Sequence, residues 1–84
     1  MDKDKLEKAE KIMKEWAEVI AQMNEILVNR MPDVMQDWAR ELDQGHKSPT
    51  KSEILYLELR RQNNELQTRA DKLQREFEIA EKSL

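Results

Sequence analysis

Apolar side chains recur at steps of three and four residues over the first third of the chain, the spacing that places them on one face of an α-helix. The series consists of Leu6, Ala9, Met13, Trp16, Ile20, Met23 and Leu27. A further apolar column lies one position before part of this series, at Ile12, Val19 and Ile26. This face is wider than the seam of a two-stranded coiled coil, so the pattern predicts a helix over about residues 3–29 that packs in a bundle.

The pattern breaks at the stretch VNRMPDVMQDW, which contains Pro32. Proline has no N–H to donate and disfavours helical geometry at the residue before it. We therefore favour a first helix that ends near Val28 or Asn29 and a short second helix, about residues 32–44, with Pro32 at its first position. One long helix kinked at Pro32 is the alternative. The apolar residues of the short segment fall on one face and are Val34, Met35, Trp38 and Leu42.

The stretch QGHKSPTKSEI contains signals that stop one helix and start another. Gly45, the chain's only glycine, suits the left-handed residue that closes a helix. Thr50 and Glu53 have the spacing of a capping box, in which each side chain accepts from the other residue's backbone amide. Ser48 before Pro49 is the rival cap. The pattern predicts a tight turn at residues 45–49, too short for a flexible tether between domains.

A second apolar series follows the turn and again advances in threes and fours. It consists of Tyr56, Leu59, Asn63, Leu66, Ala70, Leu73, Phe77, Ala80 and Leu84. Its stripe is narrower, and it predicts a long helix over about residues 50–84. Asn63 sits at a core position of this series. A buried asparagine can fix register and oligomeric state, and a solvated local stretch is the competing interpretation.

These elements predict an all-α chain in one domain, a helical hairpin or three-helix chain with heptad packing. A hairpin has a single layer, so its wide apolar faces stay exposed unless a second copy or another protein covers them. We expect a homodimer that forms a helical bundle. Core packing is the default role for the tryptophans and methionines on these faces, and anchors or a groove for another protein are the alternative. The expected interface residues are Met13, Trp16, Ile20, Met23, Leu27, Trp38, Leu59, Asn63, Leu66, Leu73 and Phe77.

Composition and charge narrow the function classes. Of the 84 residues, 39% are charged and 38% hydrophobic, which is typical of long-helix proteins, and the periodic pattern argues against disorder. There is no cysteine, which excludes disulfides and the common Cys-containing zinc sites. No apolar run is long enough to span a membrane. We expect a cytoplasmic protein.

The charge distribution argues against a nucleic-acid partner. Residues 1–44 hold 7 Lys/Arg and 11 Asp/Glu, and residues 45–84 hold 8 and 7, whereas polyanion-binding proteins usually carry a strong basic excess. The basic side chains of the last helix are interleaved with carboxylates. A dimeric regulator that touches phosphate through Lys47, Lys51, Arg60 and Arg61 remains the alternative function.

Nothing in the sequence supports catalysis, a metal or a cofactor. His46 has no second ligand nearby apart from Asp43, and no Gly-rich phosphate loop or nucleophile motif occurs. The stretch SPTKSEILYLELRRQNNELQ resembles the capped leucine-repeat segment of polyhydroxyalkanoate synthase accessory subunits. The last 35 residues are similar to the leucine-zipper end of small transposase subunits. We assign no family on these patterns and expect a non-enzymatic adaptor, scaffold or small inhibitor.

Overall fold

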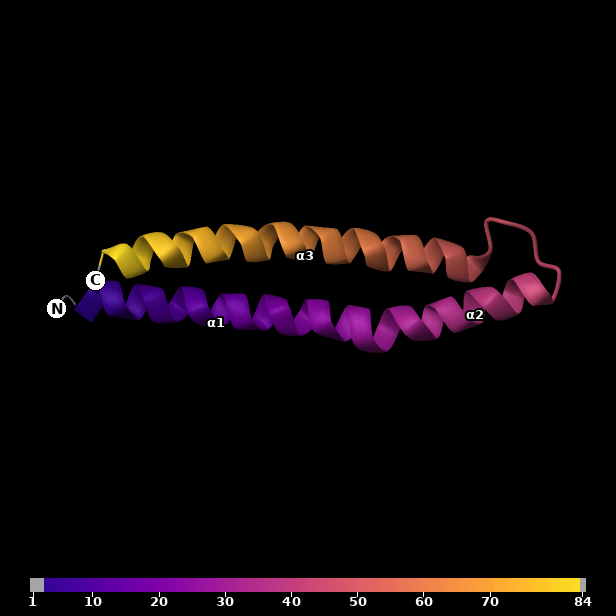
Figure 1. Cartoon of the computed structure of the whole chain (residues 1–84), viewed down its shortest axis with the longest axis horizontal. Helices are drawn as coiled ribbons and strands as arrows, with labels where there is room; N and C mark the ends of the chain where they lie inside the picture. The colour runs from indigo at the N-terminus through magenta and orange to yellow at the C-terminus, as the bar shows by residue number, and fades with distance from the viewer. Residues whose placement is uncertain (1–2, 84) are drawn as a thin grey trace.

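The computed structural model describes residues 3–83 and shows two long helical limbs lying side by side in antiparallel directions (Figure 1). The first limb consists of α1 (Lys3–Glu25), the π-helical turn η1 (Ile26–Arg30) and α2 (Met31–Asp43). The second limb is α3 (Lys51–Lys82). The molecule is a rod of 65 × 16 × 13 Å with both chain ends at one end of it. The expected all-helical hairpin is confirmed. Leu84 lies outside the described residues.

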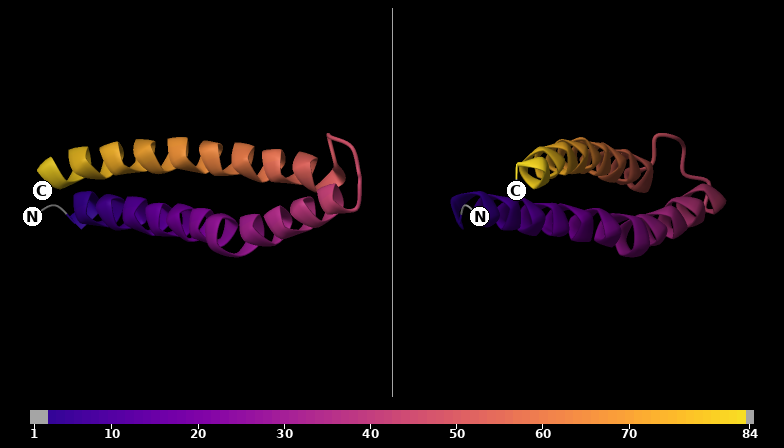
Figure 2. Two further views of the ribbon diagram at one scale, coloured as in Figure 1. Left: turned by 45° about the vertical axis from the view of Figure 1, so that its right-hand side comes forward. Right: turned by 60° about the vertical axis from the view of Figure 1, so that its left-hand side comes forward.

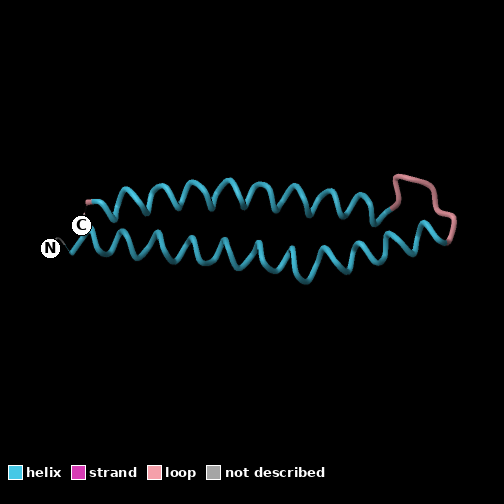
Figure 3. The backbone as a smooth tube through the Cα atoms, in the orientation of Figure 1, coloured by secondary structure: helices cyan, strands magenta, loops and turns pink. Residues whose placement is uncertain are grey.

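The first limb stays helical through Pro32, so the favoured division into two separate helices is wrong. Figure 3 shows one unbroken helical tube along this limb up to the loop at the corner. Within η1 the ladder changes from four-residue to five-residue spacing, because the Met31 amide donates to the Ile26 carbonyl. A π turn is a recognised way of absorbing local irregularity within a helix. Pro32 lies in the first turn of α2, where it is exposed and, having no N–H, donates no backbone hydrogen bond.

The π turn has a reason in the sequence, namely one extra residue in the apolar repeat. Before it, side chains that face α3 advance in threes and fours up to Ile26; the next one is Met31, five residues later, followed by Val34. In a regular α-helix Met31 would point about 140° away from Ile26. Widening one turn takes up the extra residue, so residues on both sides of η1 face α3.

The core between the limbs consists of two adjoining apolar clusters. The cluster near the chain ends holds Ile12, Val19, Met23, Ala70 and Leu73, with Trp16, Leu66, Phe77 and Ala80 packed against it. The cluster near the corner holds Ile26, Met31, Val34 and Leu59, with Tyr56 and Leu66 packed against it. Both turned views in Figure 2 keep α3 alongside the first limb.

This packing corrects the expected phase of the first helix. The column Ile12, Val19 and Ile26 faces α3, together with Ala9, Trp16 and Met23. The other half of the expected series points outward. These exposed residues are Leu6, Met13, Ile20 and Leu27. A single narrow stripe on α3 covers only one part of a wide apolar face, so the remainder stays in contact with solvent.

The corner confirms the predicted stop and start signals. Gly45 has a φ of +86°, and its amide donates to the Leu42 carbonyl at 3.0 Å, while the His46 amide donates to the Glu41 carbonyl at 3.0 Å. These two bonds form the Schellman closure of α2. The Thr50 hydroxyl accepts from the Glu53 amide at 3.1 Å and caps α3. The rival cap, Ser48, is exposed in the loop.

Candidate functional site

Most of the expected interface residues lie inside the hairpin. Met23, Leu59 and Leu73 are buried between the limbs. Trp16, Leu66 and Phe77 pack against the core, and the Trp16 and Phe77 rings lie 6.4 Å apart. Trp38 contacts Tyr56 with 5.6 Å between ring centroids, and Asn63 is half-buried on the same side of α3. These eight residues join the two limbs of one chain.

The three remaining expected residues belong to a set that faces solvent. We call this set the outer column. All six members are large and apolar, and each is between 40% and 53% exposed. They are Leu6, Met13, Ile20, Leu27, Met35 and Leu42. Successive members are seven residues apart except across η1, where the step is eight. The column therefore runs along both α1 and α2.

Small and polar side chains border the outer column in the middle of α1. A shallow hollow opens there, lined by Met13, Trp16, Ala17, Ile20, Ala21 and Asn24. Ala17 and Ala21 leave room beside the larger side chains, so another helix can approach the backbone closely at this point. The hollow is apolar along most of its lining and contains no charged side chain.

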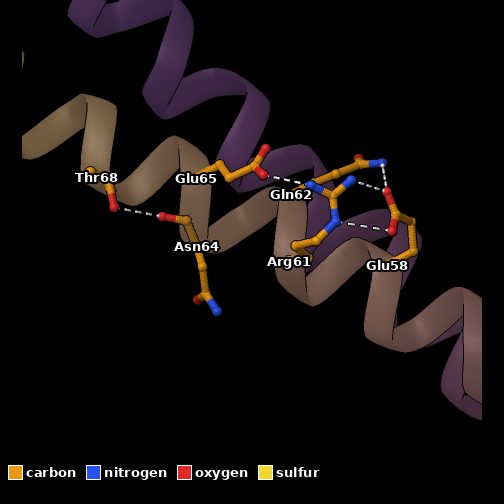
Figure 4. A network of polar contacts seen from close by, with 6 residues as sticks. All are labelled: Glu58, Arg61, Gln62, Asn64, Glu65 and Thr68. Carbon is orange, nitrogen blue, oxygen red and sulfur yellow. Dashed lines mark hydrogen bonds and ion pairs between the residues drawn. The ribbon is translucent and has the colours of Figure 1, made fainter.

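The outward surface of α3 differs because it is largely polar. Arg61 lies between Glu58 and Glu65 on this surface, and its Nε donates to Glu58 Oε2 at 3.1 Å (Figure 4). Hydrogen bonding to Arg61, and then to Gln62, holds the pKa of the Glu58 carboxyl below its ordinary value of 4.5. One of the four basic residues considered for phosphate contact is thus already paired with two carboxylates.

Further polar contacts extend along α3 away from the first limb. The Thr68 hydroxyl donates to the Asn64 carbonyl at 3.1 Å, and the Asn64 side chain points away from the first limb (Figure 4). Apolar exposure on α3 is concentrated in its first two turns, at Ile54, Leu55 and Leu57, with Ile79 near the other end. The run ILYL gave a signal for this exposure, because one helix face cannot bury four consecutive apolar residues.

The corner is held by a carboxylate that the sequence did not reveal. Glu41 of α2 accepts from the Ser52 hydroxyl at 2.8 Å and from the Ser52 amide at 3.2 Å. Thr50 and Ser52 are both buried. Glu41 thus satisfies an amide in the first turn of α3 from the other limb, where the helix dipole favours a negative charge.

This arrangement replaces half of the expected capping box. The Thr50 hydroxyl accepts from the Glu53 amide, but Glu53 Oε2 is buried without a hydrogen-bond partner among residues 3–83. The pKa of Glu41 is lowered from 4.5, chiefly by the Ser52 hydroxyl and next by the Thr50 hydroxyl. Short-range sequence rules could not find this contact, since its partners are eleven residues apart.

Two buried polar atoms between the limbs lack a hydrogen-bond partner within residues 3–83. Asn63 Oδ1 and Trp38 Nε1 have no hydrogen-bond partner among the described residues. Asn63 lies between Leu59 and Leu66, both of which pack against the cluster around η1. A buried amide without a partner destabilises the fold. The prediction that Asn63 fixes register or oligomeric state remains a prediction.

Residues with metal-binding chemistry do not converge in the described part of the chain, where no group of three or more His, Asp or Glu side chains is placed to hold a metal ion. His46 is exposed in the corner loop. None of the helices within residues 3–83 combines the length and apolar character that a membrane crossing requires. No family model, curated protein or solved structure matches this chain.

Proposed function

We propose that this chain is a non-enzymatic helical protein that assembles with itself and acts by protein–protein interaction, as an adaptor, scaffold or small inhibitor does. The outer column carries this proposal. Six large apolar side chains lie half-exposed along one line of the first limb. Large apolar side chains exposed in this way mark interaction sites on proteins that otherwise keep polar surfaces.

The shape of the molecule supports the same conclusion. A rod only 16 × 13 Å in cross-section has one layer of contact between two helices, and it lacks a second layer to cover the other faces. Single chains of this size bury a small share of their surface and commonly gain stability from a second subunit.

The experiment is a light-scattering mass on a sizing column over a tenfold concentration range, with absorbance read at 260 and 280 nm. The proposal predicts a mass about twice the 10.1 kDa of one chain. It also predicts that the ratio of absorbance at 260 nm to that at 280 nm is the ratio of a protein without bound nucleic acid. A monomer that binds no protein at micromolar concentration would contradict it. Co-eluting nucleic acid would favour the alternative regulator that uses Lys47, Lys51, Arg60 and Arg61.

A further inference from the structure

The outer column is continuous only because η1 absorbs the extra residue. Leu27 and Met35 are eight residues apart, and without the wide turn they would point about 80° away from one another. The same turn also keeps Ile26 and Met31 facing α3. The π turn therefore keeps two apolar faces of the first limb continuous from α1 to α2. One of them contacts α3, and the other is the outer column.

The exposed area of the hairpin matches the area that a stable dimer needs. The chain exposes 6589 Å², whereas a compact monomer of 10.1 kDa exposes roughly 5,300 Å². The excess is about 1,300 Å² per chain, or about 2,600 Å² for two chains. Obligate homodimers bury about 2,000–5,000 Å² in total, so a second copy of equal length accounts for the excess.

Charges at the two ends of the first limb favour one direction of pairing. Residues 3–14 carry five lysines and three acidic residues, whereas residues 31–43 carry four acidic residues and one arginine. A parallel pair would place two acidic α2 segments side by side. An antiparallel pair places each acidic α2 beside the basic start of the other α1, which is the complementary arrangement.

We infer that the occupant of the outer column is the outer column of a second copy, paired antiparallel about a two-fold axis near Asn24. This inference rests on the proposed function. In a two-fold dimer the same patch serves both subunits. Residue 24 is midway between the ends of the column, so Leu6 of one copy lies beside Leu42 of the other. Ile20 lies beside Leu27 of the other copy.

The two α3 helices lie on the outside of this dimer. The outer column follows Ile12 and Val19 by one residue and is therefore turned about 100° from the side that contacts α3. The second copy and α3 thus contact adjacent sides of the first limb without competing. Trp16, which lines the hollow and also packs against the core, stands between the two contacts.

Single cysteines test the face and the direction, because the natural chain has none. Asn24→Cys tests whether the outer column is the side of the first limb that contacts the second copy. Asn64→Cys, on the outward surface of α3, is its matched control. Leu6→Cys and Leu42→Cys test the direction, alone and in an equimolar mixture. All four positions are exposed in the hairpin, so the changes leave its core intact. The full-length variants are incubated under reducing conditions so that subunits can exchange between dimers. They are then mildly oxidised and run on a non-reducing gel.

The inference predicts a covalent dimer for Asn24→Cys and none for Asn64→Cys. It predicts a covalent dimer in the mixture of Leu6→Cys with Leu42→Cys, and none for either variant alone. Cross-linking of Leu6→Cys and Leu42→Cys each with itself means parallel pairing and overturns the inferred direction. A dimeric mass without an Asn24→Cys cross-link overturns the inferred face. In both cases the proposed function survives, whereas a monomeric mass by light scattering removes the proposed function itself.

Discussion

The two limbs of the hairpin have similar inner faces and different outer faces. On α3 one apolar stripe faces the first limb, and the middle of the outward surface carries the Glu58, Arg61 and Glu65 network. The exposed apolar residues of α3 lie toward its two ends, at Ile54, Leu55, Leu57 and Ile79. The first limb has that inner stripe and the outer column as well. Helix α3 has the pattern of a cover for one partner, whereas the first limb has the pattern of a helix with two neighbours.

The difference also explains why the irregularity lies where it does. A limb with a single apolar face could tolerate an extra residue if its apolar stripe shifted gradually around the helix axis. A limb with two faces in register loses both if its second half turns by one residue. The widened turn at η1 corrects the phase in one place, and α3 needs no such correction because it runs as a regular helix over Lys51–Lys82.

The largest expected effect comes from removing one residue from the first limb at two different places, in a Pro32→Ala background so that proline itself has no influence. Deleting Asn29 within η1 should give a continuous α-helix with both apolar faces in phase. Its melting temperature and urea midpoint should be close to those of the Pro32→Ala background. Deleting Ala21 rotates half of the limb by about 100° and removes side chains such as Ile12 and Val19 from the core. Each lost side chain costs about 1.5–3 kcal/mol.

Thermal and urea unfolding followed by circular dichroism measure the two deletions. The Ala21 deletion should lose its cooperative transition, and the Asn29 deletion should keep it. Equal tolerance of both deletions would show that the phase of the apolar faces is not what η1 preserves.

The next effect compares two leucines on α3. Leu59 is 1% exposed and lies in the core near the corner, whereas Leu57 is 53% exposed. Leu59→Ala should reduce the free energy of unfolding by about 2–5 kcal/mol, because it leaves a cavity between the limbs. Leu57→Ala should change it by less than about 0.5 kcal/mol. Urea midpoints give both values, and a similar loss at the two positions would contradict the one-faced description of α3.

A smaller effect of opposite sign is expected at Asn63. Its Oδ1 is buried without a partner among residues 3–83, so Asn63→Leu should raise the free energy of unfolding by about 1–2 kcal/mol. Gln62→Leu, one residue away, is the comparison variant in the same urea series. Destabilisation by Asn63→Leu would mean that the amide has a partner in the assembled protein.

The smallest effect concerns the corner that joins the two limbs. The pKa of Glu41 is lowered from 4.5 by its hydrogen bonds to Ser52 and Thr50. A depressed carboxyl pKa contributes stability that is present above the unfolded value and is lost as the pH falls through the folded value. The melting temperature of the natural chain should therefore exceed that of Glu41→Gln above about pH 4.5, and the difference should shrink below it.

Melting curves from about pH 3 to 7 provide this test, with Asp43→Asn as the control on the same turn of the chain. If the difference between the natural chain and Glu41→Gln stays constant down to about pH 3, the Glu41 carboxylate does not hold the corner.

The sequence predicted the features that depend on short spacing. Gly45 and Thr50 gave the ends of α2 and α3, and the threes and fours through Leu59 and Leu73 gave the buried face of α3. The phase of α1 could not be obtained in this way, since the Ile12 and Met13 columns are equally apolar and only the position of α3 distinguishes them. Local rules for proline predicted a break at Pro32. They could not predict that the helix continues through a π turn, because they take no account of the extra residue in the apolar repeat.

The contact between Glu41 and Ser52 required the folded corner, which brings two limbs together. Heptad packing, the dimer and the role of the outer column stay predictions that follow from exposure, area and charge. They all depend on whether the first limb has a second neighbour.

One measurement tests that claim most directly: the light-scattering mass of Ile20→Glu beside that of Asn64→Glu. The first change places a charge in the middle of the outer column, and the second places the same charge on the outward surface of α3. Our account predicts 10.1 kDa for Ile20→Glu and about twice that mass for Asn64→Glu. A dimer that survives Ile20→Glu, or that is lost only with Asn64→Glu, would contradict it.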